Sequence, residues 1–171
     1  MNRRPHDPFG PEELGELCRR HGLAATRQRR AVLLVLAHRS DHPTADWIVA
    51  EVRKQRPGIS RATVYRILET LAQSGIARKI CHPGSAARFE IAGLRHHHLV
   101  CMKCERMVDL MAPAFDKLPL PGSGSGFHIQ DYSIYFVGLC SECALPGAGK
   151  RPPAKRPAAK AARPAKRPPK A

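Results

Sequence analysis

The chain has 171 residues, a formal net charge of +15 and a hydrophobic content of 43%, which suits one medium-sized domain or two small ones around an aliphatic core. No apolar run approaches the roughly 20 residues that a membrane-spanning helix needs, and the N-terminal sequence MNRRPHDPFG lacks the apolar stretch of a secretory signal. We therefore expect a cytoplasmic protein with no membrane partner, whose six cysteines are metal ligands or reactive thiols rather than disulfides.

Four amphipathic segments in the first half of the chain predict helices. The first begins at Pro11, a residue suited to a first helical turn, and ends at Gly22. Two more are expected over residues 26–38 and 44–55, each opening on a threonine that can cap the free N–H groups. Ser60 caps the fourth helix. The apolar residues of this helix follow the spacing of a buried stripe and are Val64, Ile67, Leu68 and Leu71.

Short extended runs follow the fourth helix. Two of them, over residues 76–81 and 87–92, are joined by a turn that contains Pro, Gly and Ser. Helices followed by such a hairpin are typical of a winged helix. Near Gly93 the chain changes character and becomes rich in His, Cys and β-like segments. We expect the later elements to be strands over 97–101, 105–110 and 128–138 and a brief helix over 113–118.

These segments predict an α+β protein in three parts. We expect a winged-helix domain over residues 1–92, a small α/β domain over 93–145, and a disordered tail over 146–171 that is too poor in apolar residues to fold. The tail holds nine Lys or Arg and no acid, so 15 − 9 leaves a net charge of +6 for residues 1–145. Both charges favour a polyanionic partner such as nucleic acid. The alternatives are a basic protein with no such partner and a tail that only improves solubility.

The strongest chemical signal is a repeated C-x2-C pattern, at Cys101 and Cys104 and again at Cys140 and Cys143. Two intervening residues let both thiolates of a pair face one cation from a tight turn, and two such pairs offer four soft ligands in a tetrahedron. We therefore predict a structural Zn²⁺ with no position open for water. The alternative is a pair of redox motifs, but these normally lie near a βαβ pattern, which this sequence lacks.

Three consecutive histidines lie just before the first cysteine pair. Alternate side chains of an extended strand share a face, so His96 and His98 should point to one side and His97 to the other. Two imidazoles on one face can begin a divalent-metal site. A polar strand without a metal has the same pattern, so the residues alone leave both interpretations open.

Several segments between residues 12 and 143 resemble the ferric-uptake-regulator (Fur) family in order and spacing. They are GLAATRQRRAVLLVL, HPTAD, SRATVYRILETLAQSGI, ARFEI, HHHLVCMKCERMVDL and YFVGLCSEC. The resemblance implies a homodimeric, metal-sensing DNA-binding repressor in which residues 93–145 are the zinc-binding dimerisation domain. It also implies a regulatory metal between the two domains. The positions that match the ligands of this metal are His42, Glu90, His96, His98 and Asp109.

The matching ligand set indicates which cation is sensed. Three imidazoles and two carboxylates suit Fe²⁺ or Mn²⁺, which are harder ions than a thiolate site prefers. Glu90 stands where zinc-uptake members tend to have a cysteine, which disfavours a zinc sensor. Asp109 is similar to the peroxide-sensing members, in which bound Fe(II) reacts with peroxide and a ligating histidine is oxidised, here His42 or His96. The alternative is an iron- or manganese-uptake regulator without peroxide sensing.

The sequence departs from the family pattern in two places. A further metal site of many iron-sensing members would fall on His97 and Asp116 together with Arg95 and Tyr132, which are poor ligands, so we do not expect that site. The long helix that usually follows MVDL is shortened and replaced by PLPGSGSG. The geometry of the dimer is therefore open.

A winged helix places the N-terminal end of its recognition helix in the major groove. We expect Arg61 or Arg66 to contact phosphate or guanine, and the resemblance implies that Tyr65 contacts a thymine methyl group. Arg27, near the start of the second helix, should contact the DNA backbone. The alternative is an ordinary amphipathic helix with a solvated basic face. The expected DNA contacts of the fourth helix are Ser60, Arg61, Thr63, Tyr65 and Arg66.

Two other classes of protein compete with a repressor. A metalloenzyme would hold an open catalytic metal at the same His and Glu positions, but the sequence has no nucleophile elbow, phosphate loop or H-E-x2-H pattern. We therefore predict no enzyme activity and no small-molecule substrate. The second class is a zinc-stapled adaptor protein that uses the tail as a binding arm. Specific binding to an operator in the presence of a polyanion competitor separates a repressor from an adaptor.

Overall fold

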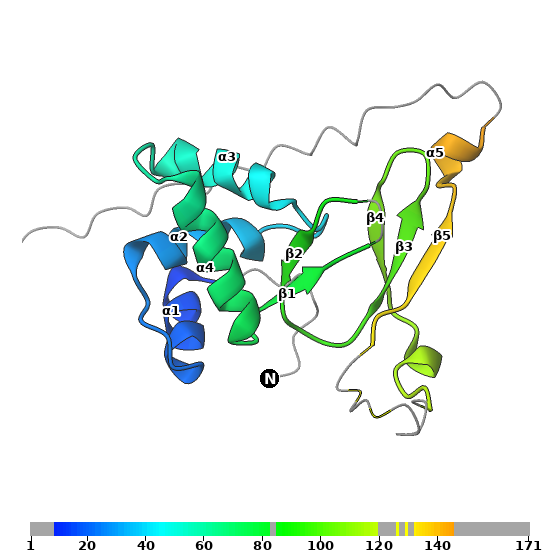
Figure 1. Ribbon diagram of the computed structural model, residues 1–171, viewed down its shortest axis with the longest axis horizontal. Helices are drawn as coiled ribbons and strands as arrows, with labels where there is room; N and C mark the ends of the chain where they lie inside the picture. Colours follow the sequence, from blue (N-terminus) through cyan, green and yellow to red (C-terminus); the bar gives the residue numbers. More distant parts are fainter. Residues whose placement is uncertain (1–8, 83–84, 120–125, 127–128, 130–131, 146–171) are drawn as a thin grey trace, which may run out of the picture.

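The computed structural model describes residues 9–82, 85–119, 126, 129 and 132–145. The chain has a helical part and a sheet part, with a two-stranded hairpin between them (Figure 1). Within the described residues, no helix has the length and apolar character that crossing a membrane requires. The predicted tail over 146–171 lies outside the described residues.

Three helices of the helical part begin directly after the predicted N-cap residues. The side chains of Thr26, Thr44 and Ser60 each accept a hydrogen bond from a backbone N–H three residues later. Each bond satisfies one of the donors that the first turn of a helix leaves free, which is why these helices begin where the sequence predicted. The helices are α1 (Pro11–Arg20), α2 (Arg27–Ala37), α3 (Ala45–Gln55) and α4 (Arg61–Gln73).

An aliphatic core holds the helical part together. The four apolar residues predicted for the fourth helix are buried on one face of α4. They pack with Val32 of α2 and Ile48 of α3, both of which are fully buried. Burying such a side chain stabilises a fold by about 1.5–3 kcal/mol. The hairpin of β1 (Ala77–Ile80) and β2 (Arg88–Ile91) adds Phe89 to this core, as the wing of a winged helix does.

The sheet part is a three-stranded sheet in the order β4-β3-β5. The central strand, β3 (His97–Cys101), pairs antiparallel with β4 (Met107–Leu110) and parallel with β5 (Tyr135–Gly138). A short helix, α5 (Ser141–Ala144), follows β5. The expected boundary between residues 92 and 93 falls between β2 and β3, and the division into domains there stays a prediction.

Three elements of the sheet part differ from the sequence-based expectation. The helix expected over 113–118 is only the 3₁₀ turn η1 (Pro113–Phe115). The strand expected over 105–110 starts at Met107, because Glu105 has a left-handed φ of 57° in the preceding turn. The strand expected over 128–138 lies partly outside the described residues and pairs only from Tyr135. The sequence analysis did not predict α5.

Candidate metal centres

Five side chains from both parts of the chain converge between the hairpin and the three-stranded sheet. One ligand atom from each lies within 4.8 Å of all the others. Two come from the winged-helix part, which is the helical part together with its hairpin: one lies in the loop before α3 and one on β2. The other three come from the sheet part. The structure thus brings together all the positions that the family resemblance implied for the regulatory metal. They are His42, Glu90, His96, His98 and Asp109.

Strand pairing explains how the sheet part contributes its ligands. His98 lies opposite Asp109 in the antiparallel β3–β4 pair. His96, two residues before His98, is on the same face of the chain, as the alternation of an extended segment predicts. His97 points to the other face, where its ring nitrogen lies 3.1 Å from an oxygen of Asp116. The histidine run therefore divides between two faces in the way the sequence indicated.

Backbone contacts hold the His42 loop against the hairpin. The N–H of Phe89 donates to the carbonyl oxygen of Pro43 at 3.0 Å, and Thr44 forms an isolated β-bridge with Arg88. His42 has a φ of 50°, which is uncommon for a residue with a Cβ atom. These contacts place the His42 ring beside the histidines of the sheet part. Its ring centroid lies 4.8 Å from that of His98.

The ring nitrogens of this cluster point at the two carboxylates. The Nε2 atom of His42 is 2.8 Å from Asp109 Oδ1 and 2.9 Å from Glu90 Oε2. The Nε2 atom of His96 is 3.0 Å from the same Glu90 oxygen. His42 is 2% exposed and Glu90 is 7% exposed, so water screens these charges weakly. A single atom or ion at the centre of the cluster would contact all of these groups.

Proximity of the carboxylates changes the proton affinity of the cluster. Burial lowers the pKa of His42, but the neighbouring carboxylates of Asp109 and Glu90 outweigh burial and raise it to about 9. Burial also lowers the pKa of His96, and Glu90 again outweighs it and raises the pKa. For Glu90, burial raises the pKa, but the three neighbouring histidines outweigh burial and hold it well below its ordinary range. Protons and a divalent cation would therefore compete for the same atoms.

We expect the metal-free chain to lose stability as pH rises from 6.5 to 9. The raised pKa of His42 adds stability that is fully present below its ordinary pKa of 6.5 and is lost as pH passes through about 9. The lowered pKa of Glu90 adds stability that is present above pH 4.5 and is lost at lower pH. The urea concentration at the midpoint of unfolding should thus be highest between pH 4.5 and 6.5. Glu90→Gln should reduce the fall of this midpoint above pH 6.5. A midpoint that rises from pH 6.5 to 9 contradicts this prediction.

The cluster fits a divalent cation. The Nε2 atoms of His42 and His98 are buried, and their contacts with the carboxylates do not have the geometry of standard hydrogen bonds. Buried polar atoms normally have partners, and a metal ion is the partner that several converging imidazoles suit. Two carboxylates balance the charge of a divalent ion, and the mixture of nitrogen and oxygen ligands suits Fe²⁺ or Mn²⁺.

The sequence analysis missed Arg78, which holds the outer oxygen of a candidate ligand. Its Nη1 donates to Glu90 Oε1 at 2.9 Å, while Glu90 Oε2 faces the histidines. The two residues lie directly opposite each other in the β1–β2 pair. Cross-strand pairs of opposite charge are a known signal, but using it requires the register of the hairpin, which the sequence did not provide.

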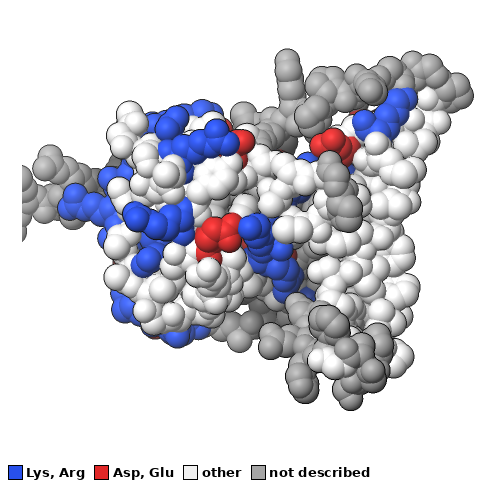
Figure 2. Space-filling view, viewed as in Figure 1, with Lys and Arg blue, Asp and Glu red and all other residues white. Residues whose placement is uncertain are grey.

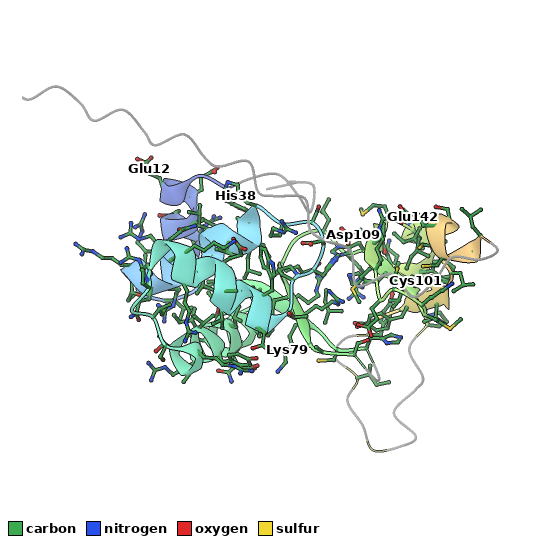
Figure 3. The ribbon with its side chains drawn as sticks, turned by 90° about the horizontal axis from the view of Figure 1, so that it is seen from above. Glu12, His38, Lys79, Cys101, Asp109 and Glu142 are labelled. Atoms are coloured by element: carbon green, nitrogen blue, oxygen red, sulfur yellow. The ribbon has the colours of Figure 1, made fainter. Side chains whose placement is uncertain are left out.

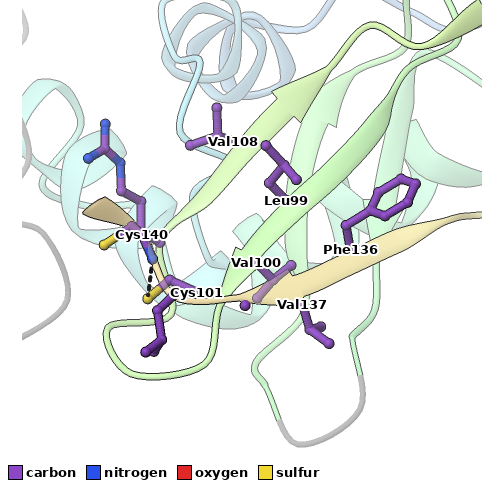
Figure 4. Close-up of a pocket in the computed structure, with 10 residues that line it drawn as sticks. Leu99, Val100, Cys101, Val108, Phe136, Val137 and Cys140 are labelled. Carbon is purple, nitrogen blue, oxygen red and sulfur yellow. Dashed lines mark hydrogen bonds between the residues drawn. The ribbon is translucent and has the colours of Figure 1, made fainter. Parts of the chain in front are cut away.

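The four predicted zinc ligands form a second cluster, at the far end of the sheet part. Their sulfur atoms lie within 4.8 Å of one another. Cys104 Sγ and Cys140 Sγ are 3.8 Å apart, which matches the edge of about 3.8 Å that a tetrahedron with Zn–S bonds of about 2.3 Å requires. The N–H of Cys140 donates to Cys101 Sγ at 3.4 Å (Figure 4). The cluster therefore fits Zn²⁺ held by Cys101, Cys104, Cys140 and Cys143.

Hydrogen bonding also favours a thiolate in this cluster. Burial raises the pKa of the Cys101 thiol, but backbone N–H groups of Cys140 and Cys104 outweigh burial and lower it to about 6.

The two other cysteines are separate, with Cys18 in the helical core and Cys81 exposed on the surface. Figure 3 labels Cys101 and Asp109 on the same sheet, so one small sheet carries ligands of both candidate centres.

The predicted DNA contacts of the fourth helix lie at the exposed start of α4, whereas Arg27 is the first residue of α2. The Oγ atoms of Ser60 and Thr63 are 2.8 Å apart within the helix cap. Arg61 and Tyr65 share one partner, because Arg61 Nη2 is 2.8 Å from Asp46 Oδ1 and the Tyr65 hydroxyl donates to the same oxygen at 2.9 Å. Arg66 on α4 and Arg27 on α2 are exposed. Figure 2 shows most of the Lys and Arg side chains of this face over the helical part.

The winged helix and the sheet part together form a candidate cation site, and the sheet part also carries four clustered cysteines. This combination is the arrangement expected of metal-responsive winged-helix proteins. The sequence profile of the ferric uptake regulator family matches residues 20–137. The chain is 31% identical over 134 residues to the peroxide operon regulator of Bacillus subtilis (strain 168), covering 78% of this chain and 92% of that protein. The chain therefore belongs to the ferric uptake regulator family, as its motifs implied.

Solved structures agree with this assignment. The crystal structure of the Campylobacter jejuni peroxide stress regulator is 30% identical, with a TM-score of 0.55 over 77% of this chain and 99% of that one. The ferric uptake regulator of Helicobacter pylori, at 22% identity, shares the fold with a TM-score of 0.65 over 82% of this chain and 97% of that one. The predicted fold class, a winged helix followed by a small domain with a four-cysteine site, is confirmed.

Proposed function

We propose that the chain is a metal-dependent transcriptional repressor whose affinity for its operator is controlled by Fe²⁺ or Mn²⁺ bound between its two parts. One observation carries this proposal: the candidate ligands come from both parts and converge within 4.8 Å. His42 and Glu90 belong to the winged-helix part, whereas the remaining ligands belong to the sheet part. A shared cation would therefore fix the position of the recognition helix relative to the sheet.

Cation binding would control DNA binding because it is linked to the equilibrium between an open and a closed arrangement of the two parts. A cation that binds the closed arrangement more tightly than the open one shifts the population toward the closed form by its difference in affinity. Couplings of this kind are typically about 1–3 kcal/mol, or roughly 5–150-fold in affinity. In a dimer, the closed arrangement sets the distance between two copies of α4, and hence between two half-sites one helical turn apart.

The names of two relatives support peroxide as the signal. The Bacillus subtilis relative is named a peroxide operon regulator, and the Campylobacter jejuni structure is that of a peroxide stress regulator. When bound, Fe²⁺ supplies the redox chemistry by which peroxide can oxidise a histidine. The chain's own role is to hold the rings of His42 and His96 in a buried site, where they are 2% and 6% exposed. The second candidate is an iron- or manganese-uptake regulator without peroxide sensing.

The remaining assignments concern partners and location. Members of this family act as DNA-binding repressors and typically as dimers. For this chain we propose a double-stranded operator contacted by the α4 residues and Arg27, a role in the cytoplasm, no catalytic turnover and no small-molecule substrate. The four cysteines would carry structural Zn²⁺, since a site with four protein ligands leaves no position for a reacting group.

Operator binding with Fe²⁺, Mn²⁺ or Zn²⁺, each with and without peroxide, tests the proposal. A peroxide-sensing repressor should bind the operator with Fe²⁺ or Mn²⁺ and lose binding after peroxide only in the iron form. Mass spectrometry of the treated iron form should then show one added oxygen on the peptide with His42 or His96. Operator binding that depends on metal but not on peroxide would favour the uptake regulator. Operator binding unaffected by any of the metals would refute both.

We expect the chain to pair with a second copy through the outer face of the sheet. Leu99 lies opposite both Val108 and Phe136, and these side chains line an apolar hollow (Figure 4). Leu99 is 43% exposed and Val108 is 41% exposed, which is unusual for apolar residues at the centre of a sheet. Leu99→Glu should therefore shift the sedimentation coefficient from that of a dimer to that of a monomer.

The control for this experiment is Ala50→Glu, which adds the same charge at an exposed position of α3. It should leave the sedimentation coefficient unchanged. A Leu99→Glu chain that keeps its circular dichroism spectrum and still sediments as a dimer would exclude this face.

A further inference from the structure

The side chain of Arg88 on β2 joins the two candidate metal centres. Its Nη1 donates to the carbonyl oxygen of His42 at 3.0 Å, and its Nη2 donates to the carbonyl oxygen of Glu105 at 3.2 Å. His42 is a candidate ligand of the regulatory cation. Glu105 follows Cys104 directly, in the turn that carries the first cysteine pair. One guanidinium group thus holds the backbone of both centres.

Both acceptor residues have an unusual backbone conformation. His42 has a φ of 50° and Glu105 a φ of 57°, and in the described part of the chain they are the only residues other than glycine with a positive φ. Such conformations are disfavoured for residues with a Cβ atom and persist where neighbouring contacts hold them. A hydrogen bond from Arg88 to each of these residues is a contact of this kind.

The chemistry of arginine suits this double role. The guanidinium group is planar, permanently charged and has donors in a fixed fork, so two of its nitrogens can satisfy two carbonyl oxygens at once. Lysine has a single ammonium nitrogen on a flexible stem and cannot fix the relative position of two acceptors in the same way. Arg88 also lies two residues from the candidate ligand Glu90 on the same strand, so both side chains are on the same face of β2.

We propose that Arg88 is a positioning residue that couples the zinc turn to the regulatory cation site. The turn around Cys104 holds the Glu105 carbonyl oxygen, Arg88 spans from that oxygen to the His42 carbonyl oxygen, and the His42 ring is thereby presented to the cation. Because coupling between two binding sites is reciprocal, a cation at the regulatory site should in turn order the zinc turn. This inference rests on the proposed function, in that both clusters bind metal.

The test compares the full-length zinc-loaded chain with Arg88→Met and Arg88→Lys. Hydrogen exchange is followed in peptides that cover residues 38–46 and 102–107, before and after addition of Mn²⁺, and Mn²⁺ affinity is measured by electron paramagnetic resonance. In the unmodified chain, Mn²⁺ should slow exchange in both peptides. In Arg88→Met, Mn²⁺ should bind about ten-fold more weakly, a loss typical of an outer-shell partner. At saturating Mn²⁺, the bound cation should no longer slow hydrogen exchange in residues 102–107 of Arg88→Met. Arg88→Lys should restore less than half of that protection.

The matched control is Arg53→Met, because Arg53 also donates to a backbone carbonyl oxygen, that of Ile59, at 3.2 Å. It should bind Mn²⁺ with unchanged affinity and keep the protection of 102–107, which separates coupling from a general loss of stability. Equal protection of 102–107 in Arg88→Met and in the unmodified chain would overturn the proposal, as would no protection in the unmodified chain when Mn²⁺ is bound.

Failure of the proposed function gives a different result. If the unmodified chain binds no Mn²⁺, the regulatory site itself is wrong. The metal-free exchange rates still test Arg88 in that case. Faster exchange of both peptides in Arg88→Met, but not in Arg53→Met, supports the bridge, and unchanged exchange of both overturns it.

Discussion

Replacing Cys104 by serine should release the structural zinc and unfold the sheet part while the helical part stays folded. Zinc sites of this type contribute an apparent 10–16 kcal/mol or so in small peptides. The sheet part cannot replace that contribution, because its buried apolar cluster consists, within the described residues, of only Val100 and Met107 together with Ile80 of β1. The helical part has an extensive aliphatic core of its own. Loss of one thiolate should therefore affect the two parts very differently.

Zinc content and hydrogen exchange measure this prediction directly. Zinc content should fall from one atom to nearly none per chain, and amide protection should be lost in β3, β4 and β5 but kept in α2, α3 and α4. Cys81→Ser is the control, because Cys81 is exposed and lies outside the cluster. A Cys104→Ser chain that retains its zinc, or that loses zinc yet keeps its sheet protected, would contradict a structural role for the four cysteines.

Replacing His96 by alanine should make operator binding weak and insensitive to metal. His96 is 6% exposed, and its Nε2 lies 3.0 Å from Glu90 Oε2, so its ring is part of the connection between the two parts. Loss of a ligand should weaken Mn²⁺ binding by more than the roughly 10–100-fold that loss of an outer-shell partner costs. Without the cation, the position of the winged helix relative to the sheet is no longer fixed.

The measurement is a footprinting titration of the operator at several Mn²⁺ concentrations, together with zinc analysis of the same sample. The zinc content of His96→Ala should be unchanged, because the four thiolates are a separate cluster. His38→Ala serves as the control, since His38 is exposed and its ring contacts only a backbone carbonyl oxygen of its own helix among the contacts described. Metal-dependent footprints of normal strength in His96→Ala would exclude this site as the sensor.

The two candidate centres differ in their ligand types and therefore in the metals that they favour. Four thiolates favour a soft or borderline ion such as Zn²⁺, whereas imidazoles with carboxylates suit Fe²⁺ and Mn²⁺. Because the ligands of the second site come from two parts of the chain, we expect its occupancy to set how these parts are arranged, whereas Zn²⁺ at the first site would keep the sheet part folded. This separation allows one small protein to keep a permanent metal and sense another.

Local rules determined most of the fold. Each helix cap depends on a side chain and an N–H three residues apart, and the buried stripe of α4 depends on a period of 3.6 residues. The pairing of cysteines within each C-x2-C also depends on a short spacing. Opposite faces for His96 and His97 follow from the alternation of an extended chain. All of these can be found in the sequence because the interacting groups are near neighbours along the chain.

The regulatory site and its supports were decided by contacts between distant segments. His42, Glu90 and His98 have no common local spacing, and only their match to a known family indicated that they form one site. The pairing of Arg78 with Glu90 required the register of the hairpin, and the bonds from Arg88 required two loops to adopt left-handed backbone conformations. Such contacts form only when the helical core and the sheet pack together, so their geometry is a property of the tertiary structure. The sequence by itself determined which side chains were available to bind metal, and packing determined which of them meet.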